Sequence, residues 1–236
     1  MDVQIRESEF TDVRQIRLFS DMKEENFSAL MQAVYVQNFP PQVDLISEGD
    51  LPDFLQILLS GGVELYAGWE DQSTTMAVVR PVSTFILAAS IKDQPYLMSA
   101  RTLEKSRIAL IPSRDVRAIF EADTAFARAI VTELAQCYRS VVKNTKNLKL
   151  RTSRERLANY VLRNHNKSGR TNFFELPIEK RKLASLLSMT PENLSRAFKA
   201  LGAYGVTVKG NMVVIEDEEK LVAFARPNRL IDDYAS

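Results

Sequence analysis

The sequence predicts an α+β fold with an N-terminal β-roll, a long helix and a C-terminal winged helix-turn-helix. Three observations predict it. Short apolar runs broken by turns fill residues 39–112, apolar residues recur every three or four positions over residues 123–150, and two short helical patterns precede a hairpin pattern over residues 180–216. We therefore expect a β-roll domain over 1–122, a long helix and hinge over 123–150, and a helix-turn-helix domain over 151–236.

Composition excludes several classes of protein. Hydrophobic residues make up 45% of the chain and charged residues 26%, as in ordinary soluble globular proteins. No apolar run reaches membrane-spanning length, and the opening residues MDVQIRESEF do not form a signal peptide. Cys137 is the single cysteine, which excludes a disulfide framework and an iron–sulfur cluster. The expected location is the reducing cytoplasm, with no membrane partner.

Charge is distributed unevenly along the chain. Residues 1–150 hold 16 Lys and Arg against 20 Asp and Glu, whereas residues 151–236 hold 15 against 10. The basic excess is densest between Lys143 and Lys182. This polarity favours an anionic partner for the C-terminal part, although a solvated helix surface has the same composition.

The first half of the chain is expected to begin with short amphipathic helices, which end near Val36, and to continue as a small β domain. The predicted strands are Asp44–Ile46, Phe54–Leu59, Val63–Tyr66, Met76–Val79 and Arg107–Ile111. Turn residues such as Ser60-Gly61-Gly62 separate these runs, which is typical of a sandwich or roll.

A short helix over Asp115–Glu121 and a much longer one capped by Asp123 or Thr124 are expected next. In the long helix, apolar residues alternate by four and three, with one polar position at Asn144. This pattern predicts a dimer interface made of Ile130, Leu134, Cys137, Val141 and Leu148. The alternative is a helix packed on its own β domain.

The segment from Lys180 to Gly202 predicts a helix-turn-helix. Leu183, Leu186 and Leu187 give the first helix an apolar face, and Thr190 and Pro191 are suited to start the second. In the second helix, the apolar residues Leu194, Phe198 and Leu201 recur at helical spacing, opposite a polar face that includes Asn193. A helix over Glu155–Arg163, a loop over Asn164–Asn172 and a hairpin of Val206–Lys209 with Met212–Glu216 are expected around it.

The polar face of the second helix has the chemistry needed to contact double-stranded DNA. Arg196 can donate two hydrogen bonds to guanine, Glu192 can accept from cytosine, and Ser195 can contact a base or a phosphate. The predicted phosphate contacts are Lys180, Arg181, Lys182, Thr190, Lys199 and Lys209. Taken alone, the same pattern equally fits a helical hairpin with a solvated face.

Nearly the whole chain resembles the Crp/Fnr family of bacterial transcription regulators. IRLFSDMKEENFSAL is similar to that family's opening helix, ISEGD and FLQILLSGGVELY to its cyclic-nucleotide-binding-like β-roll, and RTSRERLANYVL to the helix after its dimerisation helix. Glu192, Ser195 and Arg196 show the spacing of the Fnr-type recognition helix. The resemblance implies a homodimer that reads a palindrome like TTGAT-N4-ATCAA and contacts RNA polymerase. Ser188 stands where the family usually has glycine.

The stretch RPVSTFILAASIKDQPYLMSA lacks the residues with which this family binds cyclic nucleotides. Leu87-Ala88 replace a Gly-Glu pair, and Met98-Ser99 replace an Arg-Ser pair. Without that arginine no charge-assisted bond to a cyclic phosphate is expected, unless Arg80 or Arg101 substitutes. Cyclic AMP is therefore not the expected effector.

Other effectors stay open at this point. Candidate pocket residues are Tyr35, Arg80, Phe85, Leu87, Tyr96, Met98 and Ser99. Tyr35, Arg80 and Tyr96 resemble residues of the nitric-oxide-responsive denitrification regulators of this family. The region around Phe85 and Met98 is apolar, which suits haem or a filled core. The lone histidine, His165, is expected on the surface rather than as an axial ligand. One alternative is a regulator that needs no small-molecule ligand or is controlled by oxidation, and another is a β-roll ligand-binding module without a DNA role. An enzyme is not expected, because the sequence offers no set of residues that could form a catalytic site.

Overall fold

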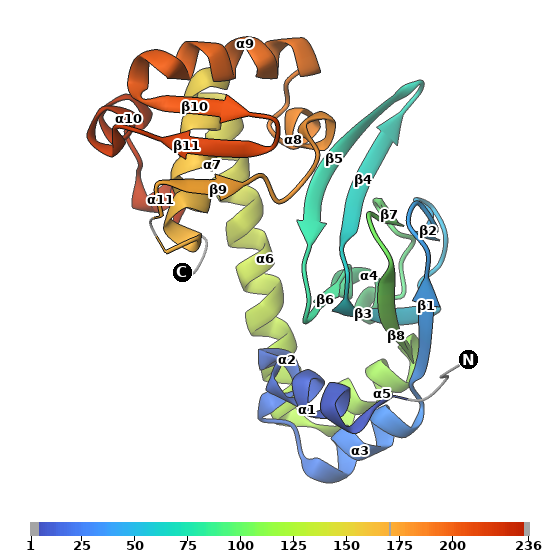
Figure 1. Ribbon diagram of the computed structural model, residues 1–236. Coiled ribbons are helices and arrows are strands. Elements are labelled where there is room, and N and C mark those ends of the chain that lie inside the picture. The colour runs from blue at the N-terminus through green and yellow to red at the C-terminus, as the bar shows by residue number, and fades with distance from the viewer. Residues whose placement is uncertain (1–4, 170, 234–236) are drawn as a thin grey trace. The chain divides into compact units, whose positions relative to one another are not determined.

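The computed structural model describes residues 5–169 and 171–233. It consists of two compact units, Met1–Ala135 and Gln136–Ser236 (Figure 1). The boundary lies inside the long helix α6 (Thr124–Leu150), so this helix contributes its first half to one unit and its second half to the other. The sequence-based division at residues 122 and 150 instead treated the helix as a separate segment.

Two four-stranded antiparallel sheets form the β-roll of the N-terminal unit. Their strand orders are β1-β8-β3-β6 and β2-β7-β4-β5. The strands are β1 (Tyr35–Phe39), β2 (Asp44–Ile46), β3 (Phe54–Ser60), β4 (Val63–Trp69), β5 (Gln72–Val79), β6 (Ser83–Phe85), β7 (Ser99–Thr102) and β8 (Ser106–Pro112). All five predicted strands are confirmed, and β1, β6 and β7 are additional. Gly61 makes the β3–β4 turn with φ +95°, where an added Cβ would lie 2.4 Å from Ser106 Oγ.

Five helices complete this unit ahead of α6. They are α1 (Glu7–Gln15), α2 (Arg17–Ser20), α3 (Glu24–Gln32), α4 (Leu87–Lys92) and α5 (Ser113–Ala122). Fully buried side chains of the helical segments, including Phe19, Phe27, Phe126 and Ile130, pack with Leu55 and Ile111 of the first sheet. A second core, with Leu58, Val63 and Ile108, fills the roll between the sheets. The start of α6 therefore belongs to the N-terminal core.

Asp123 caps α6, as one of the two sequence alternatives predicted. Its Oδ1 accepts from the backbone N–H groups of Ala125 and Phe126, at 3.0 and 3.1 Å. Its Oδ2 accepts from the N–H of Lys23 and from Asn26, both at 2.9 Å. Burial alone would raise the pKa of Asp123, but these four hydrogen bonds outweigh it and lower the pKa to about 2.

Asp123→Ala is expected to lower the free energy of unfolding by about 1–2 kcal/mol at neutral pH, because α6 loses its N-terminal cap. Because the folded-state pKa lies below the ordinary value of 3.8, this contribution is present above about pH 4 and is lost as the pH falls towards about 2. Urea unfolding of both proteins between pH 7 and 2 measures it. Asp12→Ala, at an exposed position, is the control. If the difference in unfolding free energy between wild type and Asp123→Ala were as large at pH 2 as at pH 7, the role assigned to the ionised Asp123 would be wrong.

The C-terminal unit is a winged helix-turn-helix followed by two short helices. Its elements after α6 are α7 (Ser153–Lys167), β9 (Phe173–Glu175), α8 (Lys180–Leu186), α9 (Pro191–Leu201), the 3-10 turn η1 (Gly202–Tyr204), β10 (Val206–Lys209), β11 (Met212–Ile215), α10 (Glu218–Ala225) and α11 (Arg229–Asp232). The three strands pair antiparallel in the order β10-β11-β9. Leu157, Leu183, Leu194 and Leu221 are among the residues of its core. The predicted hairpin and helix pair are confirmed; β9, α10 and α11 were not predicted.

Candidate nucleic-acid interface

Helix α9 has one buried and one exposed face. Leu194 and Leu201 are at most 1% exposed, and Ala197 and Phe198 are also buried. The remaining face carries Glu192, Asn193, Ser195, Arg196 and Lys199, all exposed. Figure 1 shows this helix along the outer edge of the C-terminal unit, beside β10. The three residues predicted to read bases therefore lie together on the exposed face of α9.

The start of α9 is fixed by Thr190 and charged by Glu192. The Thr190 hydroxyl oxygen accepts from the Asn193 N–H at 3.2 Å, which confirms the predicted cap. A hydrogen bond from the Thr190 side chain lowers the pKa of Glu192, and the Arg196 guanidinium one turn later acts in the same direction. Glu192 is thus an ionised hydrogen-bond acceptor beside a guanidinium donor.

The N-terminal turn of α8 carries three cations where helices favour anions. Lys180, Arg181 and Lys182 open this helix, and it has no acidic residue in its first turn. Cations at a helix N-terminus oppose the positive end of the helix dipole, so this arrangement costs stability unless a nearby anion offsets it. Lys180 and Arg181 are exposed and Lys182 is half-buried, while Lys199 on α9 and Lys209 at the end of β10 are exposed. These five cations belong to the set predicted from the sequence to contact phosphates, and their contact with phosphates stays a prediction.

Ser188 makes the turn between α8 and α9 in the left-handed region. Its φ is +52°, the conformation that explains why glycine is usual at this point. Arg156 of α7 holds the turn from outside, since its guanidinium donates to the carbonyl oxygens of Leu187 at 3.0 Å and Ser188 at 3.2 Å. Sequence reasoning missed Arg156, because nothing local links an arginine on one helix to a turn about thirty residues later.

Ser188→Gly is expected to stabilise the C-terminal unit by about 0.5–1 kcal/mol, because relief of the left-handed strain exceeds the extra unfolded-state entropy of glycine. Thermal or urea unfolding of the full chain measures the change. The matched control is Ser185→Gly within α8, where glycine has no strain to relieve and is expected to destabilise. A loss of stability in Ser188→Gly as large as in the control would contradict the strain argument.

His165 differs from its prediction. It was expected on the surface, but it is 3% exposed on α7. Its Nδ1 lies 3.0 Å from the Thr171 carbonyl oxygen and its Nε2 lies 3.3 Å from a carboxylate oxygen of Glu218. Because α7 continues to Lys167, the first part of the predicted polar loop is helical. His165 thus connects α7 with the rest of that loop through Thr171 and with α10 through Glu218. Both ring nitrogens face protein partners, so His165 is not placed to bind a cofactor.

Two family models match the chain. A cyclic nucleotide-binding domain matches residues 36–123, and a Crp-like helix-turn-helix domain matches residues 155–224. Together they cover about two thirds of the chain and both follow the structural elements described above. The chain is a Crp/Fnr-type regulator. It combines a sensor domain of the cyclic nucleotide-binding type with a DNA-binding domain, and its family consists of regulators, not enzymes.

Solved structures have the same architecture. A protein from Ruegeria pomeroyi, proposed to bind cyclic nucleotides, is 25% identical, with a TM-score of 0.59 over 94% of this chain and 99% of that one. FixK2 from Bradyrhizobium japonicum (83% of this chain, 98% of that one) and a CooA mutant from Carboxydothermus hydrogenoformans (95% and 99%) are each 18% identical, with TM-scores of 0.72. These two likenesses show the fold alone.

Among curated proteins, the similarity covers about half of this chain. The potassium channel KAT2 of Arabidopsis thaliana is 30% identical over 127 residues, which are 53% of this chain and only 18% of the channel. The chain therefore spans less than a fifth of the length of this curated relative. None of the helices in the described parts of the chain has the length and apolar character needed to span a membrane.

The predicted effector residues of this Crp/Fnr-type regulator are distributed over several places. Phe85 and Tyr96 belong to the core between the sheets and Met98 packs on it, whereas Leu87 belongs to the helical core. The Tyr96 hydroxyl donates to the Phe54 carbonyl oxygen at 3.2 Å, and burial, with smaller effects of Asp53 and Asp50, raises the pKa of Tyr96 to about 12. Tyr35 is exposed and packs edge-on against the Phe54 ring.

Polar groups near the expected nucleotide site already have partners. Ser99 Oγ accepts from the Glu48 N–H at 2.9 Å. Of the two arginines that could substitute for the missing one, Arg80 pairs with Glu104 at 2.7 Å and Arg101 pairs with Asp44 at 2.7 Å. The Arg101 bond is the largest cause that lowers the pKa of Asp44, so this pair is well formed.

The predicted interface on α6 needs one correction. Ile130 is completely buried in the core of its own unit, so it does not face a partner, and Leu134 is partly buried against the same core. Cys137 and Val141 are exposed and Leu148 is half-buried. Val131, Tyr138 and Val141 are each more than 60% exposed. Val131 therefore takes the place of Ile130, Cys137 stays a prediction beside the more exposed Tyr138, and the apolar stripe on this face of α6 consists of Val131, Leu134, Tyr138, Val141 and Leu148.

Proposed function

We propose that this regulator is a homodimer that binds an inverted-repeat DNA site like TTGAT-N4-ATCAA through α9. The observation that carries the proposal is the exposed face of α9, on which Glu192, Ser195 and Arg196 lie together. A helix with an exposed polar N-terminal half and a buried apolar face is the form in which helix-turn-helix proteins enter the major groove.

Each of the three side chains has a distinct role in this proposal. Arg196 donates to O6 and N7 of a guanine, and Glu192 accepts from N4 of a cytosine. Ser195 is small enough to let the helix backbone approach and contacts a base or phosphate. Arg196 follows Glu192 by one helical turn, so the donor and the acceptor lie on the same face of α9.

Phosphate contacts would come from both sides of the recognition helix. Lys180, Arg181 and Lys182 of α8, with Thr190, Lys199 and Lys209, are the proposed set. In the free protein the Thr190 hydroxyl donates its hydrogen bond to Glu192. A phosphate contact from Thr190 therefore requires this hydroxyl group to rotate so that it donates to a phosphate oxygen instead. Each cation that neutralises a phosphate releases counterions, so affinity is expected to fall steeply with salt.

The exposed stripe on α6 supports the dimer. Its members are spaced by three, four or seven residues over more than two heptads, as in parallel two-stranded coiled coils. A two-fold dimer presents two copies of α9 to half-sites about one helical turn apart, which explains why an inverted repeat would be read. Contact with RNA polymerase, which the family resemblance implies, is part of the same proposal.

The sensor domain is proposed to respond to a signal other than a cyclic nucleotide. The supporting observation is that Met98 replaces the phosphate-binding arginine while Arg80 and Arg101 are paired with carboxylates. A response to nitric oxide through haem stays a prediction, and neither the buried His165 nor the buried Tyr96 hydroxyl favours it as a ligand. The absorption spectrum of protein purified without air tests it: a Soret band would support haem, and a featureless spectrum would contradict it.

Electrophoretic mobility shift on TTGAT-N4-ATCAA DNA tests the main proposal. The expected result is a dimer complex at low salt that competitor DNA with scrambled half-sites displaces only at large excess. If the dimer binds both DNAs equally, the assigned base contacts are wrong. If it binds neither DNA, the proposal is wrong and the β-roll acts in a protein without a DNA role.

A further inference from the structure

The last helix of the described chain is tied to the end of the long helix. Arg151, the first residue after α6, donates to both carboxylate oxygens of Asp232 in α11, at 2.6 and 2.7 Å. The side chain of Arg151 is 8% exposed and that of Asp232 is 23% exposed. A bidentate, largely buried pair of this kind is among the strongest polar contacts in proteins and fixes geometry as well as distance.

Further bonds make residues 228–233 a C-terminal strap across α6. The ammonium of the buried Lys143 donates to the Asp233 carbonyl oxygen, and that of Lys146 to the Leu230 carbonyl oxygen at 3.5 Å. Asp232 also accepts from the N–H of Asn228 at 2.6 Å, which closes the turn of α11. The strap thus spans the last two turns of the long helix.

A second arginine continues the connection to the turn before α9. Arg156 donates to the Arg151 carbonyl oxygen at 2.9 Å, and its other nitrogens hold the Leu187 and Ser188 carbonyl oxygens described above. Burial lowers the pKa of Arg156, which reflects how far this guanidinium is withdrawn from water. Asp232, Arg151 and Arg156 therefore form one chain of polar contacts from the strap to the turn that precedes the recognition helix.

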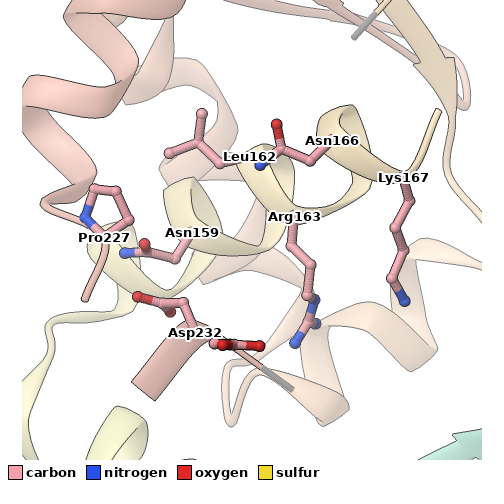
Figure 2. Close-up of a pocket in the computed structure, with 8 residues that line it drawn as sticks. Asn159, Leu162, Arg163, Asn166, Lys167, Pro227 and Asp232 are labelled. Carbon is pink, nitrogen blue, oxygen red and sulfur yellow. The ribbon is translucent and has the colours of Figure 1, made fainter. Parts of the chain in front are cut away.

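On the side that faces α7, the strap borders an open pocket. A cavity of about 490 Å³ lies there, lined by Asn159, Leu162, Arg163, Asn166, Lys167, Pro227, Asp232 and Asp233. Figure 2 shows Asp232 below Asn159 and Arg163 of α7, at the edge of this cavity. Ile231 is the buried apolar residue of the strap. The bidentate bond between Arg151 and Asp232 therefore holds the strap together with the bonds from Lys143 and Lys146.

We propose that Asp232, Arg151 and Arg156 are positioning residues that fix the recognition helix relative to the end of the long helix. Because the long helix carries the proposed dimer stripe, this fixed relation sets the spacing between the two recognition helices. The strap would therefore determine which spacer between half-sites the protein accepts. This inference rests on the proposed function for its DNA readout, but the strap itself can be tested without DNA.

The experiment uses the full chain with Asp232→Asn, and Glu219→Gln on the exposed surface of α10 as a matched carboxylate-to-amide control. Binding to inverted repeats with spacers of about three to six base pairs, a range around the helical-turn spacing, is measured for each protein. We expect the wild type and the control to prefer one spacer, and Asp232→Asn to lose about fivefold or more of that preference. A change in general stability alone would lower affinity for all spacers alike.

The DNA-independent measurement is the rate of tryptic cleavage after Lys149, at the end of α6. We expect Asp232→Asn to be cleaved about fivefold or more faster than the control, because the freed strap lets the hinge open. Arg151→Lys keeps the positive charge but loses the two parallel donors, so a cleavage rate between those of the control and Asp232→Asn is expected. If Asp232→Asn does not fold, the cleavage rate of Arg151→Lys tests the strap instead. Wild-type cleavage and wild-type spacer preference in both variants would overturn the proposal. Faster cleavage in a chain that binds no DNA would keep the strap and refute only the proposed function.

Discussion

Arg196→Ala is expected to weaken binding to the TTGAT-N4-ATCAA site by about 1–3 kcal/mol per half-site and to remove discrimination at the guanine. The physical reason is that alanine leaves guanine O6 and N7 without donors, while the buried face of α9, with Leu194 and Phe198, is untouched. Binding titrations with each of the four base pairs at the guanine position measure the effect. Folding is checked by the unfolding temperature, which an exposed side chain is not expected to change.

The matched control for this prediction is Lys199→Ala, about one turn further along the same helix. Because Lys199 is a proposed phosphate ligand, its replacement is expected to weaken binding to all sequences alike. The slope of log affinity against log salt is expected to fall by about one for each phosphate that is no longer neutralised. If Arg196→Ala also weakened all sequences alike, Arg196 would bind a phosphate and the reading of guanine by this residue would be wrong.

Val141→Glu is expected to convert the dimer into a monomer. Val141 is 63% exposed in the single chain and lies in the centre of the proposed stripe, so two unpaired carboxylates would meet across the two-fold axis. We expect the dimer dissociation constant to rise at least about a hundredfold, equivalent to about 3 kcal/mol. Sedimentation or size-exclusion chromatography across a concentration series measures it, and DNA binding is expected to fall with it.

Thr132→Glu is the control for the dimer prediction. Thr132 is exposed on α6 but lies outside the apolar stripe, and its replacement adds the same charge to the same helix. We expect this variant to remain dimeric. Dissociation in both variants would indicate a general charge effect, and a dimer in both would place the interface on another surface of the molecule.

The helix-turn-helix was predictable because local signals agree with each other. The cap at Thr190, the proline after it and the apolar spacing of Leu194, Phe198 and Leu201 all specify the same helix, and the structure confirms them. The hairpin of β10 and β11 follows equally directly from Gly210-Asn211 between two β-rich runs. Such elements depend on residues within a few positions of one another.

The remaining features depend on contacts that local sequence does not reveal. The spacing of Ile130 along the helix is compatible with a dimer interface and also with packing on the protein's own core. Only the structure, in which Ile130 packs in the core of the N-terminal unit, distinguishes the two. His165 lies in a polar stretch, yet α7 continues past it and buries it. The apolar candidate effector residues, among them Phe85, Leu87 and Tyr96, fill two cores, and the same composition would suit a pocket. The strap has only a few residues and joins positions 81 apart, so no periodicity marks it.

The position of the boundary between the two units inside α6 has a consequence for exchanging parts between members of this family. A DNA-binding fragment that starts at residue 151 would lack Lys143 and Lys146, and its last helix would have fewer partners. A fragment that starts near residue 136 keeps them. Chimaeras of two Crp/Fnr-type regulators are therefore expected to be functional most often when they are joined in the middle of the long helix, because this junction preserves both cores. A junction at the hinge near residue 151 is expected to give fewer functional proteins.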